Sequence, residues 1–101
     1  MTRTLFLAAL IVPLAVLPAF AATVVVQKNR AFRPAEISIA RGETVTFTND
    51  DSYIHQVYVT GLFDSEEKAP GENLNETFPD AGTFQVRCHI HPTMKMTVRV
   101  R

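Results

Sequence analysis

The sequence contains a single cysteine, Cys88, among its 101 residues. One thiol cannot form a disulfide within the chain, which excludes the disulfide-rich frameworks of many small exported domains. The chain also has no excess of either charge, because ten Lys and Arg residues balance ten Asp and Glu residues. Nucleic-acid binding requires a clear basic excess, so the composition argues against nucleic acid as a partner.

No uninterrupted apolar run reaches the length of about 20 residues that a membrane-spanning helix needs. The longest apolar segment, near the N-terminus, is interrupted by Pro13 and Pro18. It follows a basic residue, Arg3, and ends in the sequence AFA, which is the layout of a secretory signal peptide with its cleavage site. We therefore predict that residues 1–21 are a signal peptide cleaved after Ala21, with export to the periplasm and no membrane attachment afterwards.

The remaining residues, 22–101, show no internal repeat and no pattern of a long helix. Short alternating segments separated by glycine and proline turns indicate β-strands instead. In one of them Val45 and Phe47 face one way and the threonines face the other, the period of a half-buried strand. About seven such strands in one domain of this size predict an antiparallel β-sandwich that acts as a monomer. The strand candidates are residues 22–28, 36–40, 44–48, 54–61, 72–78, 83–88 and 96–100.

The strand before Cys88 predicts where its thiol points. Phe84, Val86 and Cys88 share one phase of this strand, so Cys88 should face the core and His89 should face outward. A buried thiol suits a shielded metal ligand, and it equally suits an inert core cysteine. In an oxidising compartment a bound metal would occupy the lone thiol and would also stabilise the fold.

The stretch CHIHPTMKM, residues 88–96, contains five side chains that can bind a metal. Cys88 and His91 are separated by two residues across a strand end, so a tight turn can direct both at one point. His55, outside this stretch, lies where a loop enters a strand, and a sandwich that gathers its loops at one pole would bring it close. Two imidazoles, a thiolate and a nearby thioether form the donor set of a mononuclear electron-transfer copper centre.

Two segments of the chain, FRPAEISIARGETVTFTNDDSYIHQVYV and AGTFQVRCHIHPTM, resemble the two halves of the cupredoxin family. Within that family the resemblance is greatest to amicyanin, followed by pseudoazurin and plastocyanin, and it covers essentially all of residues 22–101. It implies a Greek-key β-sandwich, one type 1 (blue) copper per chain and one-electron transfer. It also implies that Asn49 locks the two ligand loops together and that the backbone N–H of Asp50 points at the Cys88 sulfur.

Two methionines are candidates for the weak axial ligand. Met94 gives the amicyanin-like spacing Cys-x2-His-x2-Met, whereas Met96 gives the plastocyanin-like and pseudoazurin-like Cys-x2-His-x4-Met. Met96 is in phase with Val98 and Val100 of the last strand, so core packing explains it. Met94 precedes the strand and is free to approach a metal. We therefore predict Met94 as the axial ligand, with Met96 as the alternative.

Three further polar side chains near these ligands have a simpler interpretation. His89 should be an ordinary surface histidine, although it could also form a weak copper-capture point with Met96 or another surface donor. Asp50 and Asp51 lie in a turn, where aspartate is common for conformational reasons, so we leave them out of the ligand set.

Together these features predict a periplasmic carrier of single electrons. Its partners would be a cytochrome c, a dehydrogenase or an oxidase that docks transiently near His91, over Pro92, Thr93 and Ile54. The alternative is a protein that sequesters or delivers copper, which His89 and the second methionine would favour. An enzyme is not expected, because four bound donors leave no open position for a substrate. Structural zinc is the fallback metal.

Overall fold

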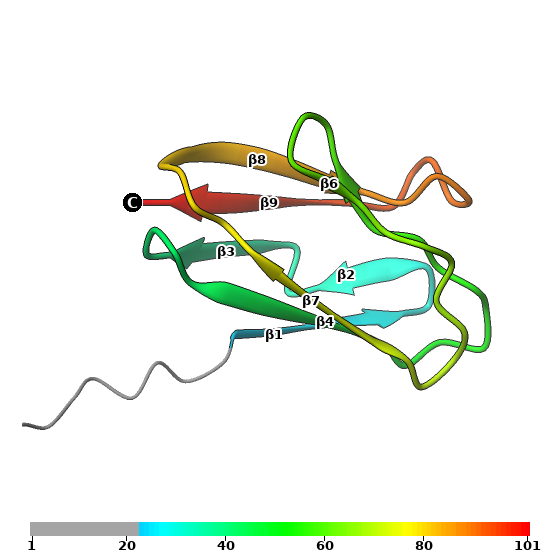
Figure 1. The fold of residues 1–101 in the computed structure, drawn as a ribbon. Coiled ribbons are helices and arrows are strands. Elements are labelled where there is room, and N and C mark those ends of the chain that lie inside the picture. The colour runs from blue at the N-terminus through cyan, green and yellow to red at the C-terminus, as the bar shows by residue number, and fades with distance from the viewer. Residues whose placement is uncertain (1–22) are drawn as a thin grey trace, which may run out of the picture.

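The computed structural model describes residues 23–101, which form two β-sheets packed face to face (Figure 1). The predicted signal peptide, residues 1–21, lies outside the described residues. Among the residues described, no helix is long and apolar enough to cross a membrane. The strands are β1 (Thr23–Lys28), β2 (Ala31–Arg33), β3 (Glu36–Ile39), β4 (Thr44–Asn49), β5 (Tyr58–Val59), β6 (Phe63–Asp64), β7 (Asn73–Thr77), β8 (Gly82–Arg87) and β9 (Lys95–Val100).

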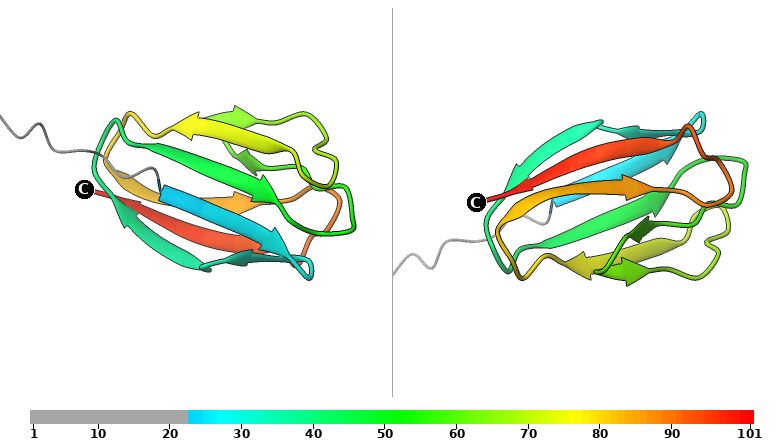
Figure 2. Two further views of the ribbon diagram at one scale, coloured as in Figure 1. Left: turned by 90° about the horizontal axis from the view of Figure 1, so that it is seen from below. Right: turned by 90° about the horizontal axis from the view of Figure 1, so that it is seen from above.

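One sheet has the strand order β2-β1-β4-β7, and the other has the order β3-β9-β8-β5-β6. Strands β2 and β3 follow one another in the chain but belong to different sheets, so this segment crosses from one layer to the other at an edge of the sandwich (Figure 2). The prediction of an all-β sandwich is therefore confirmed.

The structure differs from the predicted antiparallel sandwich of about seven strands in two details. Strands β1 and β4 pair in parallel, and so do β3 and β9. Alternation of apolar and polar residues fixes which face of a strand is buried but carries no information about its direction. The strand number differs because β2 and β6 form in segments for which the sequence predicted no strand.

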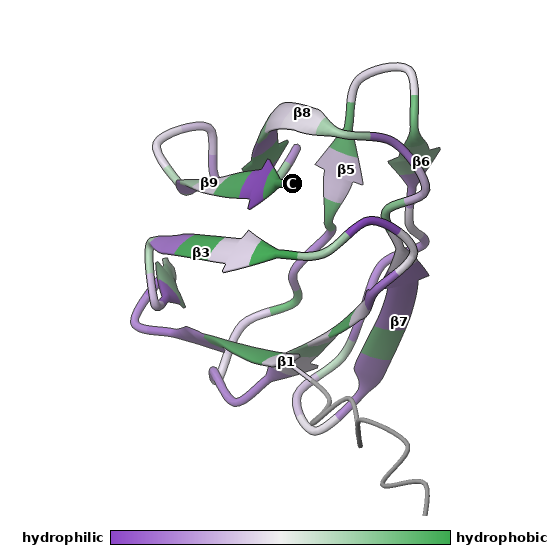
Figure 3. Ribbon diagram, turned by 90° about the vertical axis from the view of Figure 1, so that its left-hand side faces the viewer, coloured by the Kyte–Doolittle hydropathy of each residue, from purple (hydrophilic) through white to green (hydrophobic). Residues whose placement is uncertain are grey.

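The core lies between the sheets and is built by the alternation read from the sequence. Val45 and Phe47 are buried while the threonines of β4 are more exposed, and Figure 3 shows the same alternation of hydrophobic and hydrophilic residues along β9. Phenylalanine rings contact one another across the core, with neighbouring ring centroids 5.6 to 6.3 Å apart, in the order Phe32, Phe47, Phe63, Phe78 and Phe84. This continuous aromatic core holds the two sheets in a fixed relation.

The sandwich brings two distant loops to one pole. Strands β4 and β8 both end there, so the segment after Asn49 and the loop from Cys88 to Met94 lie at the same end of the molecule, opposite the C-terminus (Figure 2). Rigid strands thus position the chain segments that carry the candidate metal ligands.

Candidate metal centre

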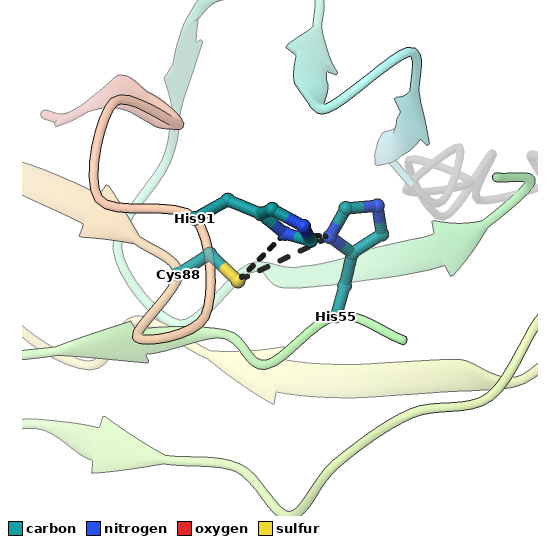
Figure 4. Close-up of side chains that lie close together, drawn as sticks. All are labelled: His55, Cys88 and His91. Atoms are coloured by element: carbon teal, nitrogen blue, oxygen red, sulfur yellow. Dashed lines mark hydrogen bonds between the residues drawn. The ribbon is translucent and has the colours of Figure 1, made fainter. Parts of the chain in front are cut away.

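Three side chains from the two loops converge at this pole, as Figure 4 shows. The Cys88 sulfur lies 4.0 Å from Nδ1 of His55 and 3.8 Å from Nδ1 of His91, and the two nitrogens are 3.1 Å apart. His55 and Cys88 are buried, and His91 is partly exposed. The structure thus brings together the three residues that the sequence analysis named as strong metal ligands.

The separations between these donor atoms fit one metal ion. Thiolate ligands lie about 2.3 Å from a metal such as zinc, and imidazole ligands lie about 2.05 Å from it. With those bond lengths, the three separations correspond to angles at the metal that sum to roughly 360°. The three donor atoms are therefore close enough together to hold one metal ion. One thiolate and two imidazoles are the strong donors of a type 1 copper centre, one per chain.

The backbone of His55 is held by a short bridge to a second segment of the chain. The His55 N–H donates to the Lys68 carbonyl at 3.0 Å, and the Lys68 N–H donates back to the His55 carbonyl at 2.7 Å. A buried histidine outside a regular strand needs such partners, because an unpaired buried backbone group is costly. The bridge therefore fixes the position of the His55 backbone, from which the imidazole side chain extends.

The ring of His55 is oriented by Asp51, whose carboxylate Oδ2 lies 2.9 Å from Nε2. Burial raises the pKa of Asp51, but hydrogen bonds from the Arg30 N–H, His55 and the Ser52 N–H outweigh it and lower the pKa to about 2. The carboxylate is therefore charged at neutral pH and accepts the proton of Nε2. This leaves the lone pair of Nδ1 directed at the metal centre.

The Cys88 sulfur accepts a hydrogen bond from the backbone N–H of Gln56 at 3.3 Å. The prediction that the Asp50 N–H has this role is wrong, because that group donates to the Gln27 carbonyl at 2.9 Å. Gln56 directly follows His55, so the segment that provides a ligand also provides the hydrogen-bond donor to the thiolate. A hydrogen bond to a thiolate stabilises its negative charge and adjusts the reduction potential of a bound metal.

His91 lies at the outer edge of the centre. Its ring packs against the edge of the Tyr53 ring, at 6.0 Å between centroids, and the Arg30 guanidinium lies 4.3 Å from the centre of Tyr53. Burial lowers the pKa of His91, and the charges of His55 and Arg30 lower it further against the opposing effect of Asp51. The neutral imidazole, which is the form that binds metals, is therefore favoured.

A family model described as a cupredoxin-like domain matches residues 4–100 of this chain. The chain belongs to the cupredoxin family.

Individual cupredoxins show the same relationship. The chloroplast plastocyanin of Fritillaria agrestis is 31% identical over 88 residues, which is 69% of this chain and 51% of that protein. This cupredoxin thus spans about half the length of that curated relative. A reduced amicyanin mutant has a TM-score of 0.75 at 27% identity, covering 79% of this chain and 82% of that one. A purple cupredoxin from Nitrosopumilus maritimus has a TM-score of 0.75 at 26% identity, covering 78% and 99%.

Asn49 acts within this cupredoxin differently from its predicted role as a lock between the two ligand loops. Its side-chain N–H group donates to the carbonyls of Tyr53 and Lys68 at 2.9 and 2.8 Å, and its oxygen accepts the Asp51 N–H at 3.0 Å. These partners hold the His55 loop to the Lys68 segment, and none belongs to the loop from Cys88 to Met94. Asn49 therefore fixes one ligand loop.

The register of β8 and β9 separates the two methionines of this cupredoxin. Val86 lies opposite Met96, and Arg87 lies opposite Lys95 in the last pair of the ladder; Cys88 follows Arg87 and Met94 precedes Lys95, both outside it. Both methionines are buried. Met94 therefore lies in the loop that also carries Cys88 and His91, whereas Met96 is paired within the ladder. This register supports Met94 over Met96.

Asp51 is a residue that the sequence interpretation of this cupredoxin dismissed. The only sequence signal for it is an aspartate four positions before a candidate ligand, and that pattern alone does not distinguish a turn residue from a partner of His55. Its role depends on Arg30 and His55, which the fold brings to the same carboxylate.

We expect Asp51→Asn to weaken copper binding by about 10- to 100-fold, the usual cost of losing the partner of a ligating histidine. Affinity would be measured by competition with a chelator of known strength. Asp50→Asn is the matched control, because it removes a neighbouring carboxylate that is exposed. Equal affinities in the two variants would contradict the orienting role of Asp51.

Proposed function

We propose that this protein carries single electrons between redox partners by means of one type 1 copper held by His55, Cys88, His91 and Met94. The observation that carries the proposal is the convergence of one thiolate and two imidazole nitrogens, 3.1 to 4.0 Å apart, at one pole. Met94 is buried and lies just outside the β8–β9 ladder in the loop that carries Cys88, which supports it as the weak fourth ligand. Copper, when bound, supplies the Cu(I)/Cu(II) couple that stores the electron.

The protein residues keep this centre rigid and dry. Asp51 and Lys68 fix His55, and the Gln56 N–H fixes the sulfur of Cys88. A site whose ligands are held in this way changes little between two oxidation states, so an electron can pass with little rearrangement. Both His55 and Cys88 are buried, which leaves the partly exposed His91 as the route between the centre and the surface.

The surface around His91 is suited to short-lived protein contacts. The exposed large hydrophobic side chains near it are Tyr53, Ile54 and Ile90. Ile54, Pro92 and Thr93, which the sequence analysis predicted for the docking surface, are exposed. Tyr53 and Ile90 were not predicted for this surface. A small apolar surface around a redox centre fits a transient partner such as a cytochrome c, a dehydrogenase or an oxidase.

We further propose that residues 1–21 direct export to the periplasm and that residues 22–101 act there as a monomeric domain. The support is the order of features in the sequence, namely a basic residue, an apolar run and a small-residue cleavage site after Ala21. An oxidising compartment also agrees with a lone thiol that a metal occupies.

The alternative function is copper sequestration or delivery. It is favoured by His89, a further donor near the centre whose ring nitrogen lies 3.1 Å from Asp64. The two functions differ in what leaves the protein during turnover. A carrier retains its copper while it exchanges electrons, whereas a copper-handling protein passes the metal to an acceptor.

We expect the copper-loaded protein to be reduced and reoxidised by a cytochrome c over many cycles without loss of copper. Stopped-flow absorption would give the rate, and a Cu(I) chelator in the mixture would report released metal. Ile54→Asp should slow the exchange by about tenfold, the effect of about 1.4 kcal/mol on docking. Val24→Asp is the matched control, because Val24 is 48% exposed and Ile54 is 46% exposed, but Val24 lies near the start of β1.

Rapid transfer of copper to the chelator, with slow electron exchange, would overturn the carrier function in favour of copper delivery. Equal rates in the two aspartate variants would contradict the docking surface but not the carrier function. The carrier function would still be visible in the repeated cycles of the wild type.

A further inference from the structure

The face formed by β5, β6 and the end of β8 carries a cluster that the proposed electron carrier does not use. Its members are Tyr58, Asp64 and His89. Nε2 of His89 lies 3.1 Å from Oδ2 of Asp64, and both side chains are exposed, at 44% and 60%. The predicted surface position of His89 is thus correct, but Met96 is buried in the core and is not available as its partner.

The separation of the two polar atoms suits a shared metal ion. Imidazole nitrogen and carboxylate oxygen both bind transition metals at about 2.0 to 2.2 Å. Two such ligands 3.1 Å apart subtend an angle of roughly 90 to 100° at the metal, the angle between neighbouring ligands in a tetragonal site. Nitrogen and oxygen ligands in tetragonal geometry are the preference of Cu(II) among the common divalent ions.

The cluster is held in place before any ion arrives. The His89 ring stacks on the Tyr58 ring, with centroids 3.7 Å apart and planes within 5°. Asp64 lies directly opposite Tyr58 in the β5–β6 pair, so the backbone register sets the carboxylate beside the stacked imidazole. An ordinary exposed ion pair contributes little and is usually mobile. Here the stack on Tyr58 restricts the His89 side chain before a metal binds, so the metal does not have to restrict it.

The same three residues border a hollow of about 460 Å³, which the β5–β6 turn from Thr60 to Leu62 also lines. Its openness to solvent leaves room for water molecules to complete the coordination of an ion held by only two protein ligands. One positive charge opposes binding, because Arg87 lies opposite Tyr58 in the sheet. Its guanidinium donates to the side-chain oxygen of Gln85 at 3.4 Å, and the Asp64 carboxylate interacts with His89 instead.

We propose that His89 and Asp64 form a second, surface site for a divalent transition-metal ion, with Cu(II) bound most strongly. The site does not depend on the type 1 centre: its ligands are different, and its ion is open to solvent and coordinated by nitrogen and oxygen. It would provide a place where Cu(II) binds within one residue of the buried Cys88.

The test is a titration of the protein with Cu(II) beyond one equivalent, followed by EPR. The second equivalent should give a tetragonal Cu(II) signal distinct from the type 1 signal. Its affinity should fall by at least about tenfold in His89→Gln and in Asp64→Asn, while the blue absorption stays unchanged. Asp80→Asn, which removes an exposed carboxylate from another turn, should bind the second ion as the wild type does. Arg87→Gln should tighten the second site.

A second ion bound equally by the wild type, His89→Gln and Asp64→Asn would overturn the proposal and show non-specific surface binding. If His89→Gln disturbs the neighbouring cysteine and weakens the blue absorption, Asp64→Asn decides, because Asp64 belongs to β6. Absence of the blue absorption from the wild type would instead count against the type 1 centre, and the tetragonal signal would still test the surface site.

Discussion

Cys88→Ser should abolish the intense visible absorption of the copper-loaded protein. A type 1 centre owes that absorption to charge transfer from its cysteine thiolate, and Cys88 is the only cysteine in the chain. The substitution is close in size, and the serine oxygen can still accept the Gln56 N–H that now donates to the sulfur. We therefore expect the variant to fold and to lose the absorption, with a tetragonal EPR signal for any copper that remains.

Thermal unfolding provides the second measurement on Cys88→Ser. Copper that binds only the folded state should raise the melting temperature of the wild type by mass action. The same addition should have little effect on the variant, since one of the three strong ligands is missing. The metal-free forms of both proteins are the control for folding. An intense visible absorption that survives in Cys88→Ser would rule out the Cys88 thiolate as its source, whereas its absence from the wild type would rule out the type 1 assignment and leave structural zinc as the fallback.

Met94→Leu should raise the reduction potential by more than about 59 mV, which is a tenfold change in a one-electron equilibrium. The axial thioether is a weak donor that stabilises Cu(II), so its removal favours Cu(I). Leucine has nearly the volume of methionine, and such a swap in a core costs less than about 1.5 kcal/mol. Potentiometry with the visible spectrum as the signal would measure the shift.

Met96→Leu is the matched control for this experiment. Met96 is also buried, and it packs opposite Val86, so its replacement should cost similar stability. Its potential and spectrum should stay close to the wild-type values. A larger shift for Met96→Leu than for Met94→Leu would transfer the axial role to Met96 and make the plastocyanin-like spacing the correct one.

The structure links both histidines to one carboxylate, which the sequence does not reveal. Asp51 bonds His55 directly, and it also accepts the backbone N–H of Arg30, whose guanidinium lies over Tyr53 beside His91. A change at Asp51 should therefore affect the buried ligand and the docking surface together. This network connects the side chains around His55 with those around His91.

Much of the fold followed from residue patterns. The burial of Val45 and Phe47, and of Val98 and Val100 in the last strand, agrees with the alternation in the sequence. The inward position of Cys88 and the outward position of His89 agree with the phase of β8. Side-chain phase is a local property with a period of two residues, so the sequence encodes it directly.

Contacts between distant segments did not follow from the sequence in the same way. The parallel pairing of β1 with β4, the Gln56 N–H at the Cys88 sulfur and the carboxylate of Asp51 on His55 all depend on how separate segments pack. The predicted roles of the Asp50 N–H and of Asn49 were wrong for the same reason. Backbone groups are identical at every residue, so a sequence cannot say which N–H reaches a given acceptor.

By itself the sequence indicated the donor set of the centre: one thiolate, two imidazoles and one of two candidate thioethers, with strand phase placing the thiol inside. The tertiary structure decided the geometry. It brought Nδ1 of His55 to 4.0 Å from the sulfur of a cysteine 33 positions away, and it buried Met94 just outside the β8–β9 ladder. The physical reason is that the chemistry of a ligand belongs to its side chain, whereas distances between ligands depend on the packing of two sheets around one core.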